Sequence, residues 1–206
     1  MAGTNNTNTY SQPCQPPLPK LFEKLSIDII LLMCYCSIMN IFYVSHNPRE
    51  CAIAHVNSHC SKMCVEYTQL LSTAHRVLDG DVWADEVGLY KATHKNHPSA
   101  KWVRESSKNY LWLHSLVSEL FNEYTYRYGR QHASARLLSQ LRALPKGIPS
   151  GPFTQPPQAM PEYCKRVDSI EAYRVYYMTE KSHLAQWKNR NVPEWYLLNS
   201  NEGVNV

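Results

Sequence analysis

The chain has 206 residues, of which 44% are hydrophobic, and this is enough to build the core of one domain. A formal net charge of +4 permits an anionic partner but does not require one. The low glycine content (7) and long stretches with helical periodicity favour a mainly α-helical fold over a β-sandwich or a β-barrel. The seven cysteines lack the spacing of a secreted disulfide framework, which indicates reduced thiols in a cytoplasmic protein.

The first part of the chain differs in composition from the rest. Residues 1–19 are rich in asparagine, threonine and proline, which is typical of a disordered segment. Residues 26–44 are apolar enough to suggest a membrane span or an imperfect signal peptide, but Asp28 interrupts them and no small-residue cleavage site follows. We interpret the beginning of the chain as an appended or alternative start and expect no membrane association. The expected boundaries are 1–38 for this segment, 39–198 for one compact helical domain and 199–206 for a flexible tail.

The elements of the helical domain can be predicted from periodicity and from helix start and stop signals. Residues 39–44 are mostly apolar and predict a short N-terminal strand. A long helix should follow from about residue 49 to 78, because Asn47 can cap it and Pro48 suits its first position. Further along we expect a second long helix, a shorter helix, a long proline-rich loop and a last helix. Their expected ranges are 97–128, 134–144, 146–164 and 168–188.

The most informative stretch is HVNSHCSKMCVEYTQLLSTAHR, residues 55–76, inside the first long helix. Six of its side chains follow one another at spacings of three and four residues, which places them on one helical stripe, called here the polar stripe. The polar stripe consists of His59, Lys62, Glu66, Gln69, Thr73 and Arg76. An apolar sector borders it on one side. A sector of small polar residues, expected to face water, borders it on the other: Asn57, Ser61, Thr68, Ser72 and His75.

Two interpretations of the polar stripe remain open. It can be a solvated flank in which Lys62 and Glu66, four residues apart, form an ordinary ion pair. It can also be the wall of a pocket, because a solvated flank has no need of histidine, glutamine, threonine and arginine in register. The pocket interpretation predicts that Glu66 and Gln69 are largely buried and face the second or the last helix.

Cysteine and histidine spacing raises the question of a metal site. Cys51, His55 and His59 follow one another at intervals of four residues and can lie on one helix face. No convincing fourth ligand accompanies them. Buried thiols and core histidines explain these residues better, so we expect no metal and no cofactor.

Two basic segments are candidates for binding the phosphates of a nucleic acid. THKNHPSAKWVRES surrounds an expected helix start, where unpaired backbone N–H groups favour anions, although capping by a solvated basic turn is the alternative. EYTYRYGR interleaves aromatic residues with arginines, and we expect most of its tyrosines to face the core. The candidate DNA-binding residues are Arg76, His94, Asn96, His97, Arg104, Arg127 and Arg130.

From residue 39 onward the chain resembles a group of small phage-encoded proteins. These open with MNIFY and carry HxxKMxxExxQxLSTAHR, an NHPS turn and a terminal EKxxxxxWxxxxxPEW segment, so the resemblance covers residues 39–196. The resemblance to this group implies no established activity. The chain is more distantly similar to phage pyrimidine-dimer DNA glycosylases of the endonuclease V type, and this resemblance implies a small all-helical domain that binds DNA. The matching elements are EYTQL at 66–70, RYG at 127–129, EK at 180–181 and WY at 195–196.

Two positions depart from the glycosylase pattern. In that family a small residue follows the initiator methionine and supplies the reactive amine, whereas Asn40 stands at that place here. The essential carboxylate of the family corresponds to Gln69, which cannot act as a carboxylate. Glu66, one helical turn earlier, is the nearest substitute.

We therefore assign catalysis to the polar stripe. Lys62 would form an imine with a sugar carbon if burial favoured its neutral amine, Glu66 would act as acid or base, and His59 and Gln69 would complete the site. The expected function is that of a phage-type, glycosylase-like enzyme that binds an extruded or modified base of DNA, as a monomer in the host cytoplasm. The alternatives are a transferase that hypermodifies a DNA base and a non-enzymatic DNA-binding or host-interaction protein.

Overall fold

A computed structural model of the chain describes residues 39–201, without the side chains of residues 199–201. The predictions made for residues 1–38 lie outside the described residues, as does the end of the tail. The described part belongs to one compact unit that begins at Met39. No helix in residues 39–201 is long and apolar enough to cross a membrane.

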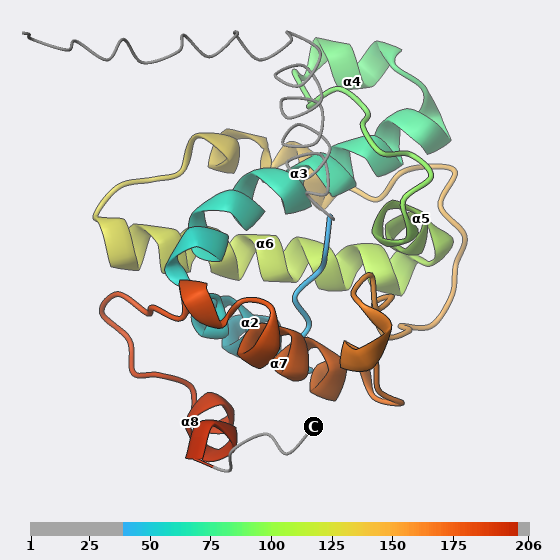
Figure 1. The fold of residues 1–206 in the computed structure, drawn as a ribbon. Coiled ribbons are helices and arrows are strands. Elements are labelled where there is room, and N and C mark those ends of the chain that lie inside the picture. The colour runs from blue at the N-terminus through green and yellow to red at the C-terminus, as the bar shows by residue number, and fades with distance from the viewer. Residues whose placement is uncertain (1–38, 202–206) are drawn as a thin grey trace, which may run out of the picture. The chain divides into compact units, whose positions relative to one another are not determined.

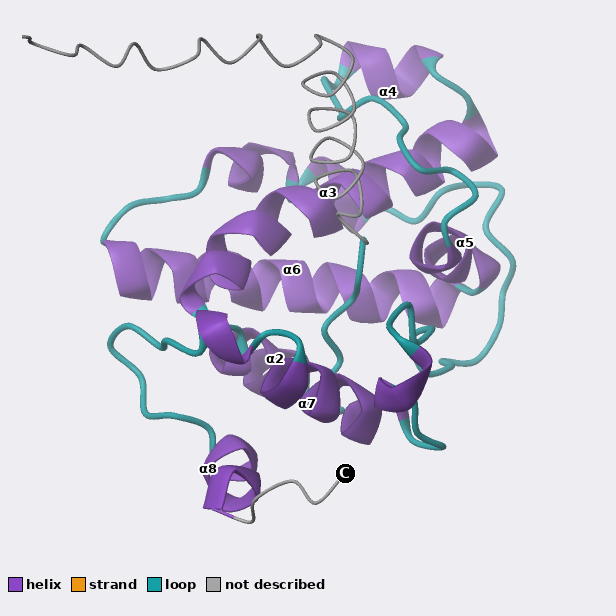
Figure 2. Ribbon diagram, viewed as in Figure 1, coloured by secondary structure: helices purple, strands orange, loops and turns teal. Residues whose placement is uncertain are grey.

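The mainly helical fold is confirmed. Within residues 39–201 there are α-helices and short 3₁₀ turns but no strand (Figure 2). The α-helices, labelled as in Figure 1, are α2 (Pro48–Ala54), α3 (Asn57–Asp79), α4 (Val82–Glu86), α5 (Pro98–Glu105), α6 (Ser107–Tyr128), α7 (Ser169–Thr179) and α8 (Glu194–Asn201). The 3₁₀ turns are η1 (Ala133–Leu137), η2 (Gln140–Arg142), η3 (Glu162–Cys164) and η4 (Ser182–Leu184).

Helix α6 is the scaffold against which α2, α3 and α5 pack (Figure 1). Residues 39–44 are not the expected strand, because they pair with no other strand in the described region and instead run as an irregular, largely buried segment beside α3 and α7. The Phe42 ring shows the depth of this segment, since it contacts the rings of His59 on α3 and Tyr177 on α7. The polar stripe of α3 therefore begins beside a segment that comes from the start of the described chain.

The prediction of one helix over residues 49–78 is wrong, because the chain leaves helical geometry between α2 and α3. His55, at φ −63° and ψ 132°, ends α2. Its Nδ1 donates to the Cys51 carbonyl at 2.6 Å, and its Nε2 accepts from the Tyr67 hydroxyl at 2.9 Å. The Tyr67 oxygen in turn accepts the Phe42 N–H at 3.0 Å. These buried side-chain bonds replace the backbone bonds lost at the break, and they depend on tertiary partners that local periodicity cannot reveal.

The second long helix is also divided. Ser106, at φ −150° and ψ 138°, separates α5 from α6. Its Oγ accepts the Lys108 N–H at 3.2 Å and donates to the Pro152 carbonyl at 2.6 Å. Nearby, Thr154 exchanges hydrogen bonds with Asn109 on α6. The proline-rich loop is thus a packed wall of the domain, and its attachment explains why the helix breaks where it does.

The remaining element predictions differ in length. The helix expected over 134–144 is replaced by the turns η1 and η2, and the last long helix, α7, ends at Thr179 instead of about residue 188. Helix α8 extends to Asn201, past the expected domain boundary at residue 198. Gly129 ends α6 at φ +67°, a left-handed conformation that suits glycine at this position.

Candidate functional site

The polar stripe of α3 faces two different neighbours along its length. In its first half, His59 Nδ1 lies 2.9 Å from the Tyr177 hydroxyl of α7. In its second half, Thr73 Oγ1 accepts the Thr93 N–H at 3.3 Å, so the loop that precedes α5 lies on this end. Gln69 is half-buried between the two halves, and Glu66 is only 9% exposed. Apart from the exposed Lys62, the stripe therefore lies largely against protein; Glu66 is buried as the pocket interpretation expects, while Gln69 is less buried than expected.

The sector expected to face water is mostly buried, which corrects that prediction. Thr68, Ser72 and His75 are at most 2% exposed. Their polar groups are accommodated locally, since Thr68 Oγ1 donates to the Cys64 carbonyl and Ser72 Oγ donates to the Thr68 carbonyl. Helix α3 thus has protein on both flanks, which small hydroxyl side chains permit because they can bond back to their own helix.

His59 is a core residue rather than a catalytic acid or base. Its ring stacks on Phe42 with centroids 4.2 Å apart. Burial is the main cause that lowers the pKa of His59 to about 2, and electrostatic interactions with His55, Lys181 and Lys62 contribute to the same shift. The imidazole is therefore neutral at physiological pH, and its contribution is to pack α3 against α7 and the entering segment.

Lys62 and Glu66 form the ion pair that their spacing predicts, with Nζ and Oε1 3.2 Å apart. The Lys62 side chain is 50% exposed, whereas that of Glu66 is 12% exposed. The Lys62 amine is half-solvated, so the burial that an imine-forming lysine requires is not present. Of the two charged groups, only the Glu66 carboxylate is largely removed from water.

Three polar groups that border the first half of the stripe were not among the residues assigned to the candidate site from the sequence. Asn40 is 1% exposed, and its Oδ1 accepts the Tyr173 hydroxyl at 3.3 Å. Tyr176 hydrogen-bonds to Asn40 and interacts electrostatically with Lys62. Lys181 places its ammonium 5.1 Å from the centre of the Tyr176 ring. Asn40 is the only amide side chain in the largely apolar run MNIFYV, and this feature of the sequence could have identified it as a site residue.

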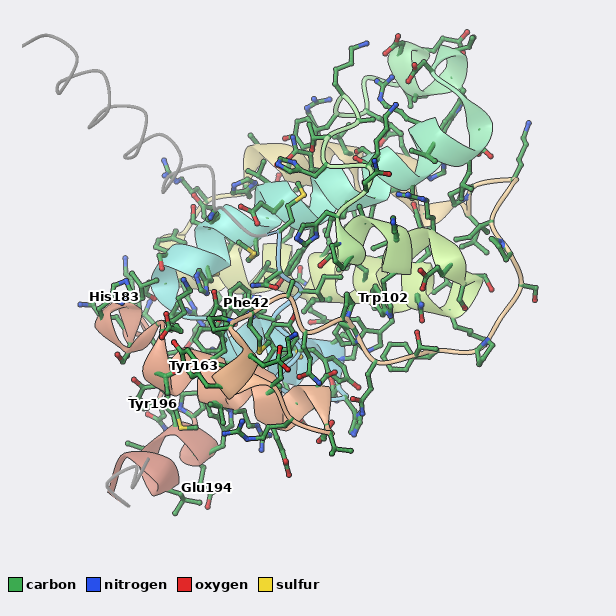
Figure 3. The ribbon with its side chains drawn as sticks, turned by 45° about the vertical axis from the view of Figure 1, so that its right-hand side comes forward. Phe42, Trp102, Tyr163, His183, Glu194 and Tyr196 are labelled. Atoms are coloured by element: carbon green, nitrogen blue, oxygen red, sulfur yellow. The ribbon has the colours of Figure 1, made fainter. Side chains whose placement is uncertain are left out.

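Positive charge gathers where α3 meets the end of α7. Lys62, Lys181 and His183 all act electrostatically on His59 from this side. Figure 3 shows Phe42 and His183 in the same region of the molecule, with Tyr163 below them. This face can therefore attract an anion.

The basic turn before α5 forms as an ordered structure. His97 caps α5 by accepting the Ser99 N–H on its Nδ1 at 3.2 Å, and its own N–H donates to the His94 carbonyl at 2.8 Å. Arg104 donates to the Lys95 carbonyl at 2.6 Å, which ties the turn to α5. His94, at φ +47°, and Asn96 are exposed. The turn thus presents His94 and Asn96 to solvent, while His97 and Arg104 hold it in place.

Two buried hydroxyl groups next to this turn lack a hydrogen-bond partner among the described residues. They are Thr93 Oγ1 and Ser99 Oγ. A groove of about 400 Å³ also lies alongside α5, bordered by Asn96, Lys101 and Trp102. Thr73 links this region to the polar stripe, so the two candidate surfaces form parts of one side of α3 and α5.

Arg127 is not available to bind DNA, which corrects its assignment. Its side chain is fully buried and paired with Glu123 at 2.6 Å, and Arg190 also contacts Glu123 at 2.8 Å. The guanidinium donates further to the carbonyls of Ile53 and His55, at the break between α2 and α3. Arg127 therefore caps a helix end inside the core. Arg130, beyond the end of α6, is exposed and remains a candidate.

Arg76 is likewise a structural residue and not a DNA contact. Its side chain is 2% exposed and pairs with Asp81 and Asp85, both at 2.7 Å. It also donates to the carbonyls of Leu89 and Tyr90. This arginine holds α4 and the following loop against the end of α3, and none of its donors points to an open surface.

The residues considered for a metal site have other roles in the structure. Cys51 exchanges hydrogen bonds with Ser45, His55 bonds to Tyr67, and His59 bonds to Tyr177. No group of three histidine, cysteine, aspartate or glutamate side chains within the described part of the chain is arranged to hold a metal ion.

Comparison of the chain with protein-family models, with curated proteins and with solved structures gives no match.

Proposed function

We propose that the protein acts on DNA, with the basic turn at residues 94–104 on the phosphate backbone and a base or its sugar at the Glu66 region of the polar stripe. One observation carries the proposal. The buried carboxylate of Glu66 lies on the same helix face that holds the basic turn through Thr73 and Thr93. A basic turn that would bind phosphate and a potential acid–base group are thereby held on the same rigid elements.

The chemistry that this arrangement supports best is hydrolysis of a glycosidic bond to a base. Glu66 would accept a proton from a water molecule that attacks the C1′ atom of the sugar. The C1′–N bond then breaks, the base leaves with the bonding electron pair, and solvent protonates it. The products are a free base and an abasic sugar. Lys62, half-exposed and charged, would contact a neighbouring phosphate rather than attack the sugar.

A second candidate is transfer of a small amine-bearing group onto a DNA base. The Glu66 carboxylate already accepts an ammonium group, that of Lys62, at 3.2 Å. A substrate ammonium of similar size can occupy the same position. This chemistry would add mass to a base, whereas hydrolysis would release one.

Mass spectrometry of nucleosides and released bases separates these functions. DNA from phage and from bacterial hosts would be incubated with the protein, with Glu66→Gln and with Glu86→Gln, whose side chain is exposed on α4. Hydrolysis predicts a free base and abasic sites that depend on Glu66 but not on Glu86. A base of increased mass, formed only when an amine donor is added, would favour transfer. Binding without any change of the DNA would leave a non-catalytic DNA-binding protein, and no affinity at low salt would reject every DNA function.

A further inference from the structure

A separate cavity lies at the opposite end of α3 from the Glu66 region. Its volume is about 680 Å³, which is within the usual range for a small-molecule site. The last turns of α3 contribute His75, Leu78 and Asp79, helix α4 contributes Trp83, and the segment after η2 contributes Leu144 and Lys146. His75 follows Glu66 by roughly 14 Å along the helix axis, so this cavity is distinct from the Glu66 region.

The hydrogen bonds around His75 determine where its proton lies. The Tyr110 hydroxyl donates its single hydrogen to the Leu141 carbonyl at 2.8 Å. His75 Nε2 lies 2.9 Å from the same hydroxyl oxygen, so Nε2 must be the donor in that contact. In the neutral ring the other nitrogen, Nδ1, is then an acceptor.

His75 Nδ1 faces another acceptor instead of a donor. It has no hydrogen-bond partner among the described residues although the side chain is 2% exposed. Asp79 Oδ2 lies 3.6 Å away, beyond hydrogen-bond distance. The carboxylate itself accepts the N–H groups of Lys146 at 2.9 Å and Gly147 at 3.0 Å. Burial lowers the pKa of His75, only partly opposed by Asp79 and the Ala143 carbonyl, so a proton does not fill this position at neutral pH.

The other residues that line the cavity indicate which further chemical groups a ligand should carry. The Trp83 indole lies with its centroid 5.0 Å from the imidazole of His75 and is 38% exposed. Leu144 is also 38% exposed, so the cavity presents aromatic and aliphatic surface to solvent. Lys146 is exposed, and its ammonium forms no ion pair with the described residues. Since Asp79 is occupied by backbone donors, the available charge at the cavity is positive.

We propose that this cavity binds a planar aromatic ring that carries an N–H donor and an anionic group, with a mononucleotide as its occupant. The ring lies against Trp83, its N–H donates to His75 Nδ1, and the phosphate pairs with Lys146. Aromatic acids such as indole-3-acetate have the same three features and are the other source of this chemistry.

Isothermal titration calorimetry with four probes tests the proposal. Thymidine monophosphate carries the ring, the N3–H donor and the phosphate. Thymidine lacks the anion, N3-methylthymidine monophosphate lacks the donor, and indole-3-acetate has all three features on another ring system. We expect saturable binding of thymidine monophosphate and about tenfold weaker binding of each compound that lacks one feature. Tighter binding of indole-3-acetate would identify aromatic acids as the source of the ligand.

Variants of the exposed wall residues connect this binding to the cavity. Lys146→Ala should weaken thymidine monophosphate binding about tenfold and leave thymidine binding unchanged, with Lys108→Ala, exposed on α6, as the control. Trp83→Ala should abolish binding of all probes, and circular dichroism would verify its fold. Glu66→Gln should bind as the wild type does, which keeps this result independent of the proposed DNA chemistry. Absence of saturable binding for all four probes, or unchanged binding by Trp83→Ala, overturns the proposal.

Nitrogen-15 NMR of the histidine side chains reports directly on the tautomer of His75 and on the contact between its Nδ1 and the ligand. The wild-type protein without added ligand should show His75 as the Nε2–H tautomer at pH 7.5. Thymidine monophosphate should shift its Nδ1 resonance in the direction of an acceptor that has gained a donor, while N3-methylthymidine monophosphate should not. An Nδ1 resonance that is unaffected by saturating thymidine monophosphate contradicts the proposed binding mode.

Discussion

Two acid–base pairs with the same spacing have opposite environments in this protein. Lys62 and Glu66 on α3, and Glu123 and Arg127 on α6, are each four residues apart. The Arg127 side chain is 0% exposed and that of Glu123 is 3% exposed, whereas the Lys62 side chain is 50% exposed. Arg127 also donates to two backbone carbonyls at a helix break. The α6 pair is part of the architecture of the fold, and the α3 pair presents a charged group at the surface.

This difference shows what distinguishes a structural ion pair from a candidate site. A guanidinium has five donors in a fixed plane, and Arg127 uses them on a carboxylate and on two backbone carbonyls. The Lys62 ammonium lies next to water and can exchange its contacts with those of a ligand. Accessibility of the cation, not the pairing itself, indicates where a ligand can bind.

Loss of the arginine from the α6 pair should have the largest effect on stability. Arg127→Met leaves the Glu123 carboxylate buried with Arg190 as its remaining partner and leaves two carbonyls without donors. We expect the free energy of unfolding to fall by about 3–5 kcal/mol. The matched change Lys62→Met should alter it by less than about 1 kcal/mol, because an exposed pair contributes little. Urea denaturation of both variants measures the difference, and equal costs would contradict the comparison.

His55 adjoins the α6 pair, because its carbonyl accepts from Arg127. The free energy of unfolding should therefore depend on pH through the buried His55 imidazole. Burial lowers the pKa of His55 to about 4 in the folded protein, compared with roughly 6.5 in the unfolded chain. As pH falls, the unfolded chain therefore takes up a proton first. The stabilisation is complete above pH ~6.5 and is lost by pH ~4, a change of about 3 kcal/mol.

Denaturation of His55→Gln across this pH range tests the assignment. The variant should show a flatter decline between pH ~6.5 and ~4, although His59, whose pKa is lowered to about 2, adds a decline of the same sign. His183→Gln, at an exposed position, is the control. The same slope in His55→Gln and the wild type would show that His55 is not the buried group responsible.

Exchange of each carboxylate for an amide should separate stability from chemistry. Glu66→Gln should change the free energy of unfolding by less than about 1 kcal/mol, because its half-exposed partner Lys62 remains solvated. In the same variant, base release should fall by about 10²–10⁴-fold if Glu66 is the general base. Glu123→Gln should destabilise the protein more strongly because two arginines then lose a charged partner. Full activity in folded Glu66→Gln would remove Glu66 from the proposed mechanism.

Periodicity and capping residues were sufficient to predict the helical fold and several helix ends. Asn47 caps α2, Asp168 caps α7 and Gly129 ends α6, as their local chemistry indicates. The two helix breaks were not predictable, because His55 and Ser106 are stabilised there by residues far along the chain, such as Tyr67 and Pro152. Local signals identify where a helix can start, while tertiary hydrogen bonds decide where it is interrupted.

The candidate site was predictable to a similar extent. The spacing on α3 placed Lys62 and Glu66 together, and the burial of Glu66 followed from its position beside the apolar sector. The sequence could not show that Arg127 is buried, because its carbonyl partners belong to α2 and to the chain break. Asn40 was missed for a related reason, since its partner Tyr173 lies on the far α7.

The smallest predicted effect concerns an accessible cation outside either pair. Lys101, exposed on α5 within residues 94–104, should contact a single phosphate if the proposed DNA surface is correct. Lys101→Ala should then weaken DNA binding by about threefold at moderate salt and reduce the slope of log K against log salt by about one, because one fewer counterion is released. Lys165→Ala is the matched control, since this lysine is already paired with Glu162 at 2.7 Å on η3. Fluorescence anisotropy over a salt series measures both quantities. If the two variants lose affinity equally, binding reflects net charge rather than the basic turn, and the DNA surface must be sought elsewhere on the protein.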